Sequence, residues 1–295
     1  MNETRLQAPM LLIGPLLFLY MLLAGAPEAL GQEIERRPDT SERGEQARRE
    51  LLSRLASGDE EQRIDSAVRI SALLQDEPGV VETSVITSLC AALQQDSSPL
   101  VRALAARALE IYAGNQTGNQ AGNRGGTQGD EAGAALLAAL GKERDLAARK
   151  AIIYALARYA QPQVTSALIP FLKNKSSELR AAAAYALAES GDPASARALA
   201  ELLKRGGNDD AFARSQAARG LGRIGGRDSI DLLIDALSDD GSQEVRRDAA
   251  ISLGRIVTPQ DAKAVEALRK ATLSNDPYLV SAAENAIASI NSRNP

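Results

Sequence analysis

One spacing of apolar and polar positions recurs along most of this chain. In the segment 244–256, EVRRDAAISLGRI, small or apolar residues lie one residue before the basic residue Arg246 and three, seven and ten residues after it. These offsets mark one face of an α-helix. Further copies follow at intervals of 31 to 47 residues, which predicts seven related amphipathic helices. Their anchoring positions are Arg63, Arg102, Arg149, Arg180, Arg214, Arg246 and Val280.

A residue suited to capping a helix stands four positions before each anchor. Asp and Ser side chains accept a hydrogen bond from an unpaired N–H of the first helical turn, so this column predicts where the helices begin. In two copies the next residue is Pro99 or Pro277, at the first helical position, where a missing N–H costs nothing. The predicted caps are Asp59, Ser98, Asp145, Ser176, Asp210, Ser242 and Asp276.

Another amphipathic run precedes each capped helix. Around Ile234, apolar residues recur with helical spacing from 230 to 237. Each repeat therefore consists of a helix A, a short turn and a helix B. One such hairpin cannot bury its own apolar face, whereas a stack of hairpins encloses a continuous core. We predict an all-α fold, an α-solenoid of about seven hairpins over residues 45–292. The other helix A runs are 51–55, 85–93, 134–140, 167–172, 196–203 and 264–273.

The helix B pattern, V/L/A-R-x-x-A-A-x-A/G-L-G/A-x-I, resembles HEAT repeats, armadillo-like helical hairpins, and specifically the short Ala-rich type of the phycobilisome bilin lyases. The resemblance covers roughly residues 45–290. It implies that helix B lines the concave surface of the solenoid. It also implies that the recurring Arg bonds an acidic or amide group in the turn of a neighbouring repeat. Suitable acceptors lie six residues before the anchors, at Asp96, Glu143, Asn174, Asn208 and Asp240.

The N-terminal region predicts export. Residues 8–26 form an uncharged apolar run behind Arg5, and a small-x-small site, Ala29 and Gly31, follows. This order is typical of a secretory signal peptide, residues 1–31, cut after Gly31. An uncleaved membrane anchor through residues 8–26 is the alternative, because about 20 apolar residues span a bilayer. In either case we expect the protein outside the cytoplasm, periplasmic or secreted.

Two segments do not follow the repeat. Residues 32–44 are rich in charge and are predicted to be a tether. Residues 113–129, AGNQTGNQAGNRGGTQG, contain no aliphatic residue larger than Ala, so they cannot offset the entropy of ordering. We predict a disordered loop there, inserted between the second and third repeats.

Composition removes several classes of function. The chain has no His among 295 residues, which excludes His-dependent triads and His-ligated metals. A net charge of −4 and an aromatic content of 3% argue against a nucleic-acid partner. The only cysteine, Cys90, stands in a core column of its helix and is expected to be buried. We predict no metal, no cofactor and no catalysis.

Three functions remain. The first is a non-catalytic exported scaffold that binds a protein or peptide along the helix B face. The second is a lyase-like or chaperone-like subunit that handles a tetrapyrrole, which rests on the resemblance alone. The third is an envelope-organising protein that self-associates. The sequence does not identify the partner or the oligomeric state, and a membrane enters only through an uncleaved N-terminal segment.

The candidate binding site lies five residues after the anchors, opposite the core columns of helix B. In repeats two to five this position is basic or aromatic, and neighbouring outward positions are basic. Tyr and Arg are enriched at interface hot spots, and an acidic partner segment would complement the charge. The column is Arg107, Tyr154, Tyr185 and Arg219, and the flanking residues are Lys150, Arg158, Arg223, Arg247 and Arg255.

Overall fold

The computed structural model describes residues 42–76, 82–116, 127–159, 161–205 and 210–293. Within these ranges it contains fourteen α-helices and no strand. The chain divides into two compact units, Met1–Glu45 and Gln46–Pro295. All structure below lies in the second unit, apart from the first turn of the first described helix. The predicted signal peptide lies outside the described residues.

The helices alternate as seven hairpins, which confirms the predicted all-α repeat architecture. The A helices are α2 (Glu42–Ser57), α4 (Thr83–Gln95), α6 (Thr127–Lys142), α8 (Pro162–Leu168) with η2 (Ile169–Lys173), η3 (Pro193–Ser195) with α10 (Ala196–Leu203), α12 (Arg227–Asp239) and α14 (Ala262–Ala271). The B helices are α3 (Glu60–Asp76), α5 (Pro99–Gln116), α7 (Leu146–Leu156), α9 (Ser177–Ser190), α11 (Ala211–Ile224), α13 (Gln243–Ile256) and α15 (Pro277–Ser292).

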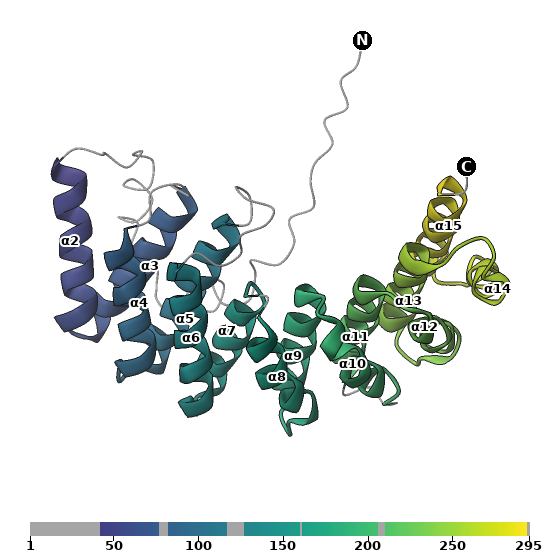
Figure 1. Cartoon of the computed structure of the whole chain (residues 1–295), viewed down its shortest axis with the longest axis horizontal. Helices are drawn as coiled ribbons and strands as arrows, with labels where there is room; N and C mark the ends of the chain where they lie inside the picture. Colours follow the sequence, from purple (N-terminus) through teal and green to yellow (C-terminus); the bar gives the residue numbers. More distant parts are fainter. Residues whose placement is uncertain (1–41, 77–81, 117–126, 160, 206–209, 294–295) are drawn as a thin grey trace, which may run out of the picture. The chain divides into compact units, whose positions relative to one another are not determined.

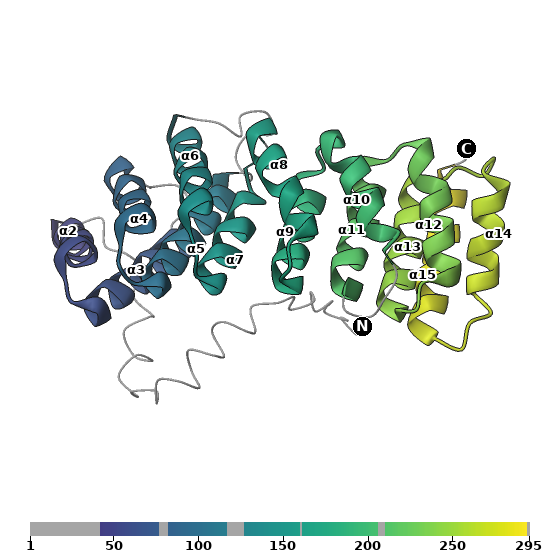
Figure 2. The same ribbon diagram turned by 90° about the horizontal axis from the view of Figure 1, so that it is seen from below.

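Within Gln46–Pro295 the hairpins stack side by side in two layers (Figures 1 and 2). Each B helix packs against the next B helix along the chain, from α3 to α15. The A helices form the other layer, and the core lies between the two. Apolar residues seven positions after the anchor are buried in the first six repeats, as the helical spacing predicts. These residues are Ile70, Leu109, Leu156, Leu187, Leu221 and Leu253.

Small residues allow the B helices to approach closely. A Cβ atom added at Gly220 would lie 3.1 Å from the Cα of Ala188 on the preceding B helix. A Cβ at Gly254 would lie 2.7 Å from the Cβ of Ala286 on the following one. Either distance is too short for two carbon atoms without movement of the backbone. The Ala-rich and Gly-rich columns of the repeat are therefore the contact surface between consecutive B helices.

All seven predicted starts of the B helices are confirmed, since each helix begins one residue after its predicted cap, and the capping hydrogen bond itself forms in four of the seven copies. The Asp145 carboxylate accepts from the N–H of Ala148 at 2.9 Å, and the Ser176 hydroxyl accepts from that of Leu179. Asp59 and Asp276 also accept from the first turns of their helices. The caps at Asp210 and Ser242 are wrong, since neither side chain bonds its helix. Ser98 is wrong as well, because its buried hydroxyl has no hydrogen-bond partner.

The boundaries of two irregular segments also differ from the predictions. Residues 113–116 form the last turn of α5, and 127–129 form the first turn of α6. The predicted loop 113–129 is therefore too long at both ends, and its middle, 117–126, lies outside the described residues. Helix α2 likewise begins at Glu42, inside the predicted tether 32–44. Helix α2 therefore extends toward the N-terminus beyond the apolar positions that pack it against the core.

Replacing Asp145 with Ala should lower the free energy of unfolding by about 1 kcal/mol, because an N–H at the start of α7 loses its acceptor. Ser242→Ala is the matched control and should change it by less than about 0.5 kcal/mol, since Ser242 makes no capping bond. Urea melts of both variants measure the difference. Equal losses at the two positions would contradict the capping geometry.

Candidate binding surface

A series of Arg–carboxylate contacts joins successive repeats. In each, a B helix Arg donates to an acidic residue at the turn between helices A and B of the following repeat. Arg63 donates to Asp96 from Nε at 2.7 Å and from Nη2 at 3.1 Å. We call this series the Arg–carboxylate ladder. Its contacts are Arg63–Asp96, Arg102–Glu143, Arg180–Asp210, Arg214–Asp240 and Arg247–Asp276.

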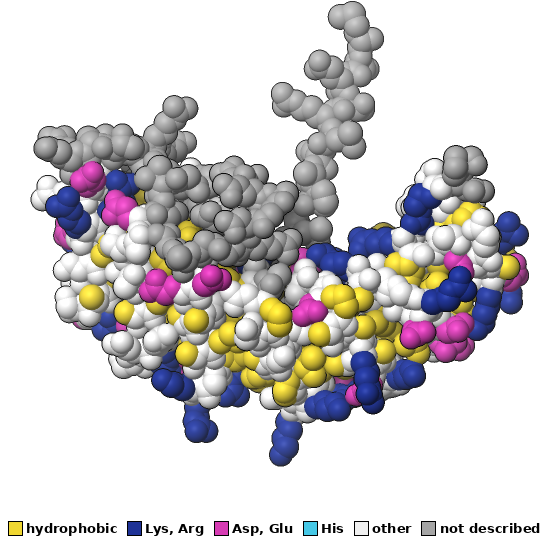
Figure 3. Space-filling view, viewed as in Figure 1, with side chains coloured by type: hydrophobic (Ala, Val, Ile, Leu, Met, Phe, Trp, Pro, Cys, Tyr) yellow, Lys and Arg dark blue, Asp and Glu magenta, His cyan; other side chains and the backbone are white. Residues whose placement is uncertain are grey.

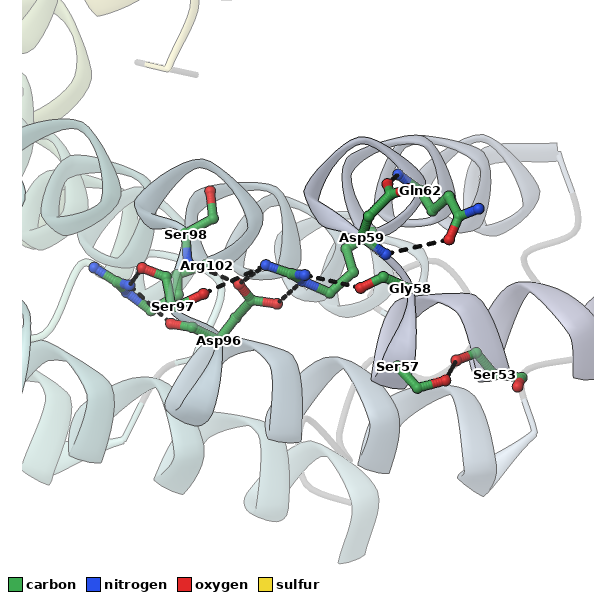
Figure 4. Close-up of polar contacts among 10 residues, drawn as sticks. Ser53, Ser57, Gly58, Asp59, Gln62, Asp96, Ser97, Ser98 and Arg102 are labelled. Atoms are coloured by element: carbon green, nitrogen blue, oxygen red, sulfur yellow. Dashed lines mark hydrogen bonds and ion pairs between the residues drawn. The ribbon is translucent and has the colours of Figure 1, made fainter.

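The same groups also hold each turn together from within. Asp96 accepts from the backbone N–H of Ser98 at 2.8 Å, and its own carbonyl accepts from Arg102 at 2.8 Å (Figure 4). Arg102 in turn reaches forward to Glu143, with Nε–Oε2 and Nη2–Oε1 distances of 2.7 and 2.9 Å. Arg63, Arg102 and Arg180 therefore each bind their own turn and the next one. The carboxylates of Asp96, Glu143, Asp240 and Asp276 each accept from their own turn as well as from an Arg of the preceding repeat.

The predicted acceptors are partly right. Asp96, Glu143 and Asp240 act as expected, whereas Arg180 bonds Asp210 and Asn208 lies outside the described residues. Asn174 accepts no side chain from the preceding repeat in the described structure. The last contact shifts by one residue along α13. Arg246 donates to the carbonyl of its own turn at Asp240, and the adjacent Arg247 makes the bond to Asp276.

The charged side chains of the ladder are poorly exposed to water, so each charge is stabilised mainly by its ladder partner. The Arg214 side chain is 1% exposed and that of its partner Asp240 is 8% exposed. Hydrogen bonds from Arg102, together with two backbone N–H groups, lower the pKa of Glu143 from 4.5 to about 2 despite burial. At Asp240 burial is the largest single influence and raises the pKa, but the Arg214 contact, the N–H of Ser242 and the charge of Arg246 together outweigh it and the pKa is lowered. Both carboxylates are thus ionised at neutral pH.

The predicted site residues lie on one layer, along α5, α7, α9, α11 and α13, except that Arg158 lies in the turn directly after α7. Tyr154 on α7 and Tyr185 on α9 meet edge to face, with ring centroids 5.4 Å apart and an interplanar angle of 67°. Both rings are partly exposed and partly packed on the core. Burial raises the pKa of both phenols, so they remain neutral hydrogen-bonding groups. We call the two tyrosines with Arg107, Lys150, Arg158, Arg219, Arg223 and Arg255 the B-helix ridge.

The ridge is less basic than predicted, because three of its cations are paired. Arg107 bonds Glu110 on the same helix at 2.6 Å. Lys150 bonds Glu178 of the next repeat, and Arg223 bonds Glu189 of the preceding one at 3.0 Å. Arg247 leaves the predicted site altogether because it belongs to the ladder and lies over the Tyr278 ring.

Two cations without an ion pair lie near Tyr185. Arg158 and Arg219 are exposed and make no ion pair within the described ranges. Both charges act on Tyr185, together with the larger opposing effect of Glu189, which is itself paired with Arg223. Arg255 is likewise exposed, and the charges of Arg219 and Arg255 both act on the half-buried carboxylate of Asp248. Figure 3 shows further Lys and Arg side chains over the lower edge of the view, so positive charge is not confined to the ridge.

Sequence reasoning missed the apolar ends of the same column. Val68 and Ile251 also stand five residues after their anchors, and they are 39% and 41% exposed. The repeat register itself could have found them, since they occupy the first and sixth copies of the position. The column therefore presents an apolar residue, an Arg, two tyrosines, an Arg and another apolar residue in order.

The described residues show little that suggests reactive chemistry. They contain no group of three acidic or cysteine side chains placed to hold a metal. Cys90 is buried as predicted, and burial raises the pKa of its thiol to about 11. Because the thiolate is the nucleophile, this thiol is inert at neutral pH. None of the described helices has the length and apolarity needed to cross a bilayer.

This fold and surface define the class, an α-solenoid whose repeats present one continuous layer of helices. The family model for HEAT repeats matches residues 133–211 and 207–288, together more than half of the chain. The chain therefore belongs to the HEAT-repeat family, and the resemblance in the helix B pattern is confirmed.

Solved structures share this fold at low sequence identity. An engineered protein is 22% identical, with a TM-score of 0.52 over 83% of this chain and 68% of that one. The E. coli protein YibA is 20% identical, with a TM-score of 0.51 over 85% and 88%. The CpcE–CpcF complex of phycocyanin lyase from Nostoc is 21% identical, with a TM-score of 0.42 over 84% and 76%. No curated protein sequence matches this chain.

Replacing Glu143 with Gln should destabilise the protein at pH 7 and remove part of its acid sensitivity. The folded-state pKa of Glu143 lies below its ordinary value, so its contribution is present above about pH 4.5 and is lost as the pH falls toward 2. The shift corresponds to about 3 kcal/mol. Urea melts from pH 7 to pH 3 should show the wild type and variant converging. Glu266→Gln, at an exposed position of α14, should change neither quantity.

Proposed function

We propose that this chain is a non-catalytic scaffold that binds an acidic segment of a protein partner across the B-helix ridge. The observation that carries the proposal is the partly exposed Tyr154–Tyr185 pair, flanked by the unpaired cations Arg158 and Arg219. Rigid aromatic rings supply contact area at small entropic cost, and nearby Arg side chains complement carboxylates. The resemblance to HEAT repeats makes this face the concave one.

A non-catalytic role agrees with how the acidic residues are used. Glu143, Asp210 and Asp240 are engaged by Arg side chains in the ladder. The Cys90 thiol is protonated. A carboxylate that is ionised and held by a guanidinium is a poor general acid or base at neutral pH. The surface is better suited to recognition than to catalysis.

Charge reversal on the ridge tests this function without opening a cavity. The probe is a synthetic ten-residue peptide with four glutamates and two phenylalanines, and its counterpart carries lysine for glutamate. The acidic peptide should bind the full chain, more weakly as salt shortens the range of the attraction. Arg158→Glu/Arg219→Glu should weaken binding about tenfold or more, measured by fluorescence anisotropy, since charge pairs set interface affinity on that scale.

The control variant is Arg227→Glu/Arg269→Glu, which makes the same change at exposed positions on α12 and α14. It should leave the affinity unchanged. The proposed site is wrong if both double variants bind the acidic peptide equally, or if the lysine peptide binds as tightly as the acidic one. A visible absorption band on the purified protein would instead support the tetrapyrrole alternative.

We propose further that this scaffold works outside the cytoplasm. The support is the uncharged run 8–26 followed by Ala29 and Gly31. Expression of the full chain in a bacterial host should yield an extracytoplasmic product whose intact mass corresponds to a start at Gln32. A full-length product retained in the membrane fraction would favour the anchor, and one in the cytoplasm would exclude export.

A further inference from the structure

One interface of the solenoid lacks its ladder contact. Between the third hairpin, α6 and α7, and the fourth, α8 and α9, the B helix cation is Arg149 and the following turn carries Asn174 in place of an acid. Arg149 Nη2 donates to the carbonyl of its own turn at Glu143, but its Nε is buried without a hydrogen-bond partner. At this interface alone, among the six in the described residues, a partly buried Arg faces a turn in which the acceptor position carries an amide and not a carboxylate.

The helices on both sides of this interface are also short or irregular. Helix α7, with 11 residues, is the shortest of the seven B helices. Its neighbour in the other layer, α8, ends after 7 residues and continues as a 3-10 turn that contains Pro170. Proline has no N–H to donate, and 3-10 geometry gives poorer hydrogen bonds than an α-helix. The interface is thus flanked by the shortest B helix and by an A helix that is broken into an α-helical part and a 3-10 part.

Two contacts bridge the interface on the ridge side. The Lys150–Glu178 ion pair is 30% and 52% exposed, so water screens it and it adds little stability. The other contact is the Tyr154–Tyr185 pair, with one ring on each side. The candidate binding site therefore spans the interface that has no ladder contact.

We infer that the interface between α7 and α9 is a flexible joint. We also infer that a partner bound across both tyrosines holds the two helices at one relative angle. The first half rests on the missing ladder contact and the weakened helices. The second half rests on the proposed function, because it requires a partner that touches Tyr154 and Tyr185 together. A ligand that contacts both sides binds one joint angle better than others and shifts the population toward it.

Asn174→Asp places the missing carboxylate at a position where the turn already holds a side-chain oxygen. Asn174 Oδ1 already accepts from the N–H of Ser176 at 2.9 Å, as Asp96 and Asp240 accept within their own turns at 2.8 Å. An Asp at 174 should therefore hold the same orientation and meet Arg149. The matched control is Asn275→Asp, which adds the same charge to the exposed turn before α15.

Amide hydrogen exchange of the full chain tests the joint without any ligand. In the wild type, α7 and α9 should exchange faster than α11 and α13. Asn174→Asp should slow exchange in α7 and α9 about tenfold or more, while Asn275→Asp leaves it unchanged. Wild-type exchange that is no faster in α7 and α9, or equal behaviour of the two variants, would overturn the joint.

Spin labels test the coupling. Labels at Gln94 on α4 and Asp235 on α12, both exposed, report the spread of distances across the joint in a Cys90→Ala background. Asn174→Asp should narrow the distribution, and so should the acidic probe peptide added to the wild type. If the peptide binds without narrowing the distance distribution, the proposed coupling of binding to the joint is wrong, while the proposed function stands. No peptide binding would remove the proposed function, while narrowing by Asn174→Asp alone would still support the joint.

Discussion

The contact on which this solenoid depends most is the bond from a B helix guanidinium to the carboxylate of the next turn. A single hairpin exposes its apolar face, so the fold exists only when neighbours align in one register. A planar guanidinium and a carboxylate meet with defined geometry, as Arg63 and Asp96 do through two bonds. Replacing a buried ion pair with apolar residues is often neutral for stability, so we ascribe to the ladder mainly the register between repeats. The apolar columns supply the energy of stacking.

Close packing of the B helices has a consequence for the opposite face. Gly220 allows α9 and α11 to approach, and Gly254 allows α13 and α15 to approach. On the face opposite the core, the ion pair of Arg223 with Glu189 joins α11 to α9. Between α7 and α9, the Tyr154 and Tyr185 rings lie 5.4 Å apart. The surface is thus a continuous strip to which each repeat adds one or two side chains.

The helices, their order and the core columns could be predicted from the sequence, because helical spacing and core burial are local properties repeated seven times. Pairing across repeats could not. Asp210 is a plausible cap by position, yet Arg180, thirty residues earlier, takes its carboxylate. From the sequence, Lys150 and Arg223 are expected to be unpaired cations. In the structure, stacking of the repeats places Glu178 beside Lys150 and Glu189 beside Arg223. The ion pair Arg107–Glu110 could have been predicted from the sequence, since residues three apart on a helix lie on the same face.

The ladder also bears on how such a chain can lengthen. Most internal repeats carry a carboxylate acceptor in the turn and a donor on the B helix, as Asp96 and Arg102 show, six positions apart in one segment. A duplicated copy of that segment would offer a donor to the unit after it and an acceptor to the unit before it. Gene duplication can therefore insert a repeat without a compensating change elsewhere. A copy with an amide in the turn, like the one containing Asn174, would bring a second joint with it.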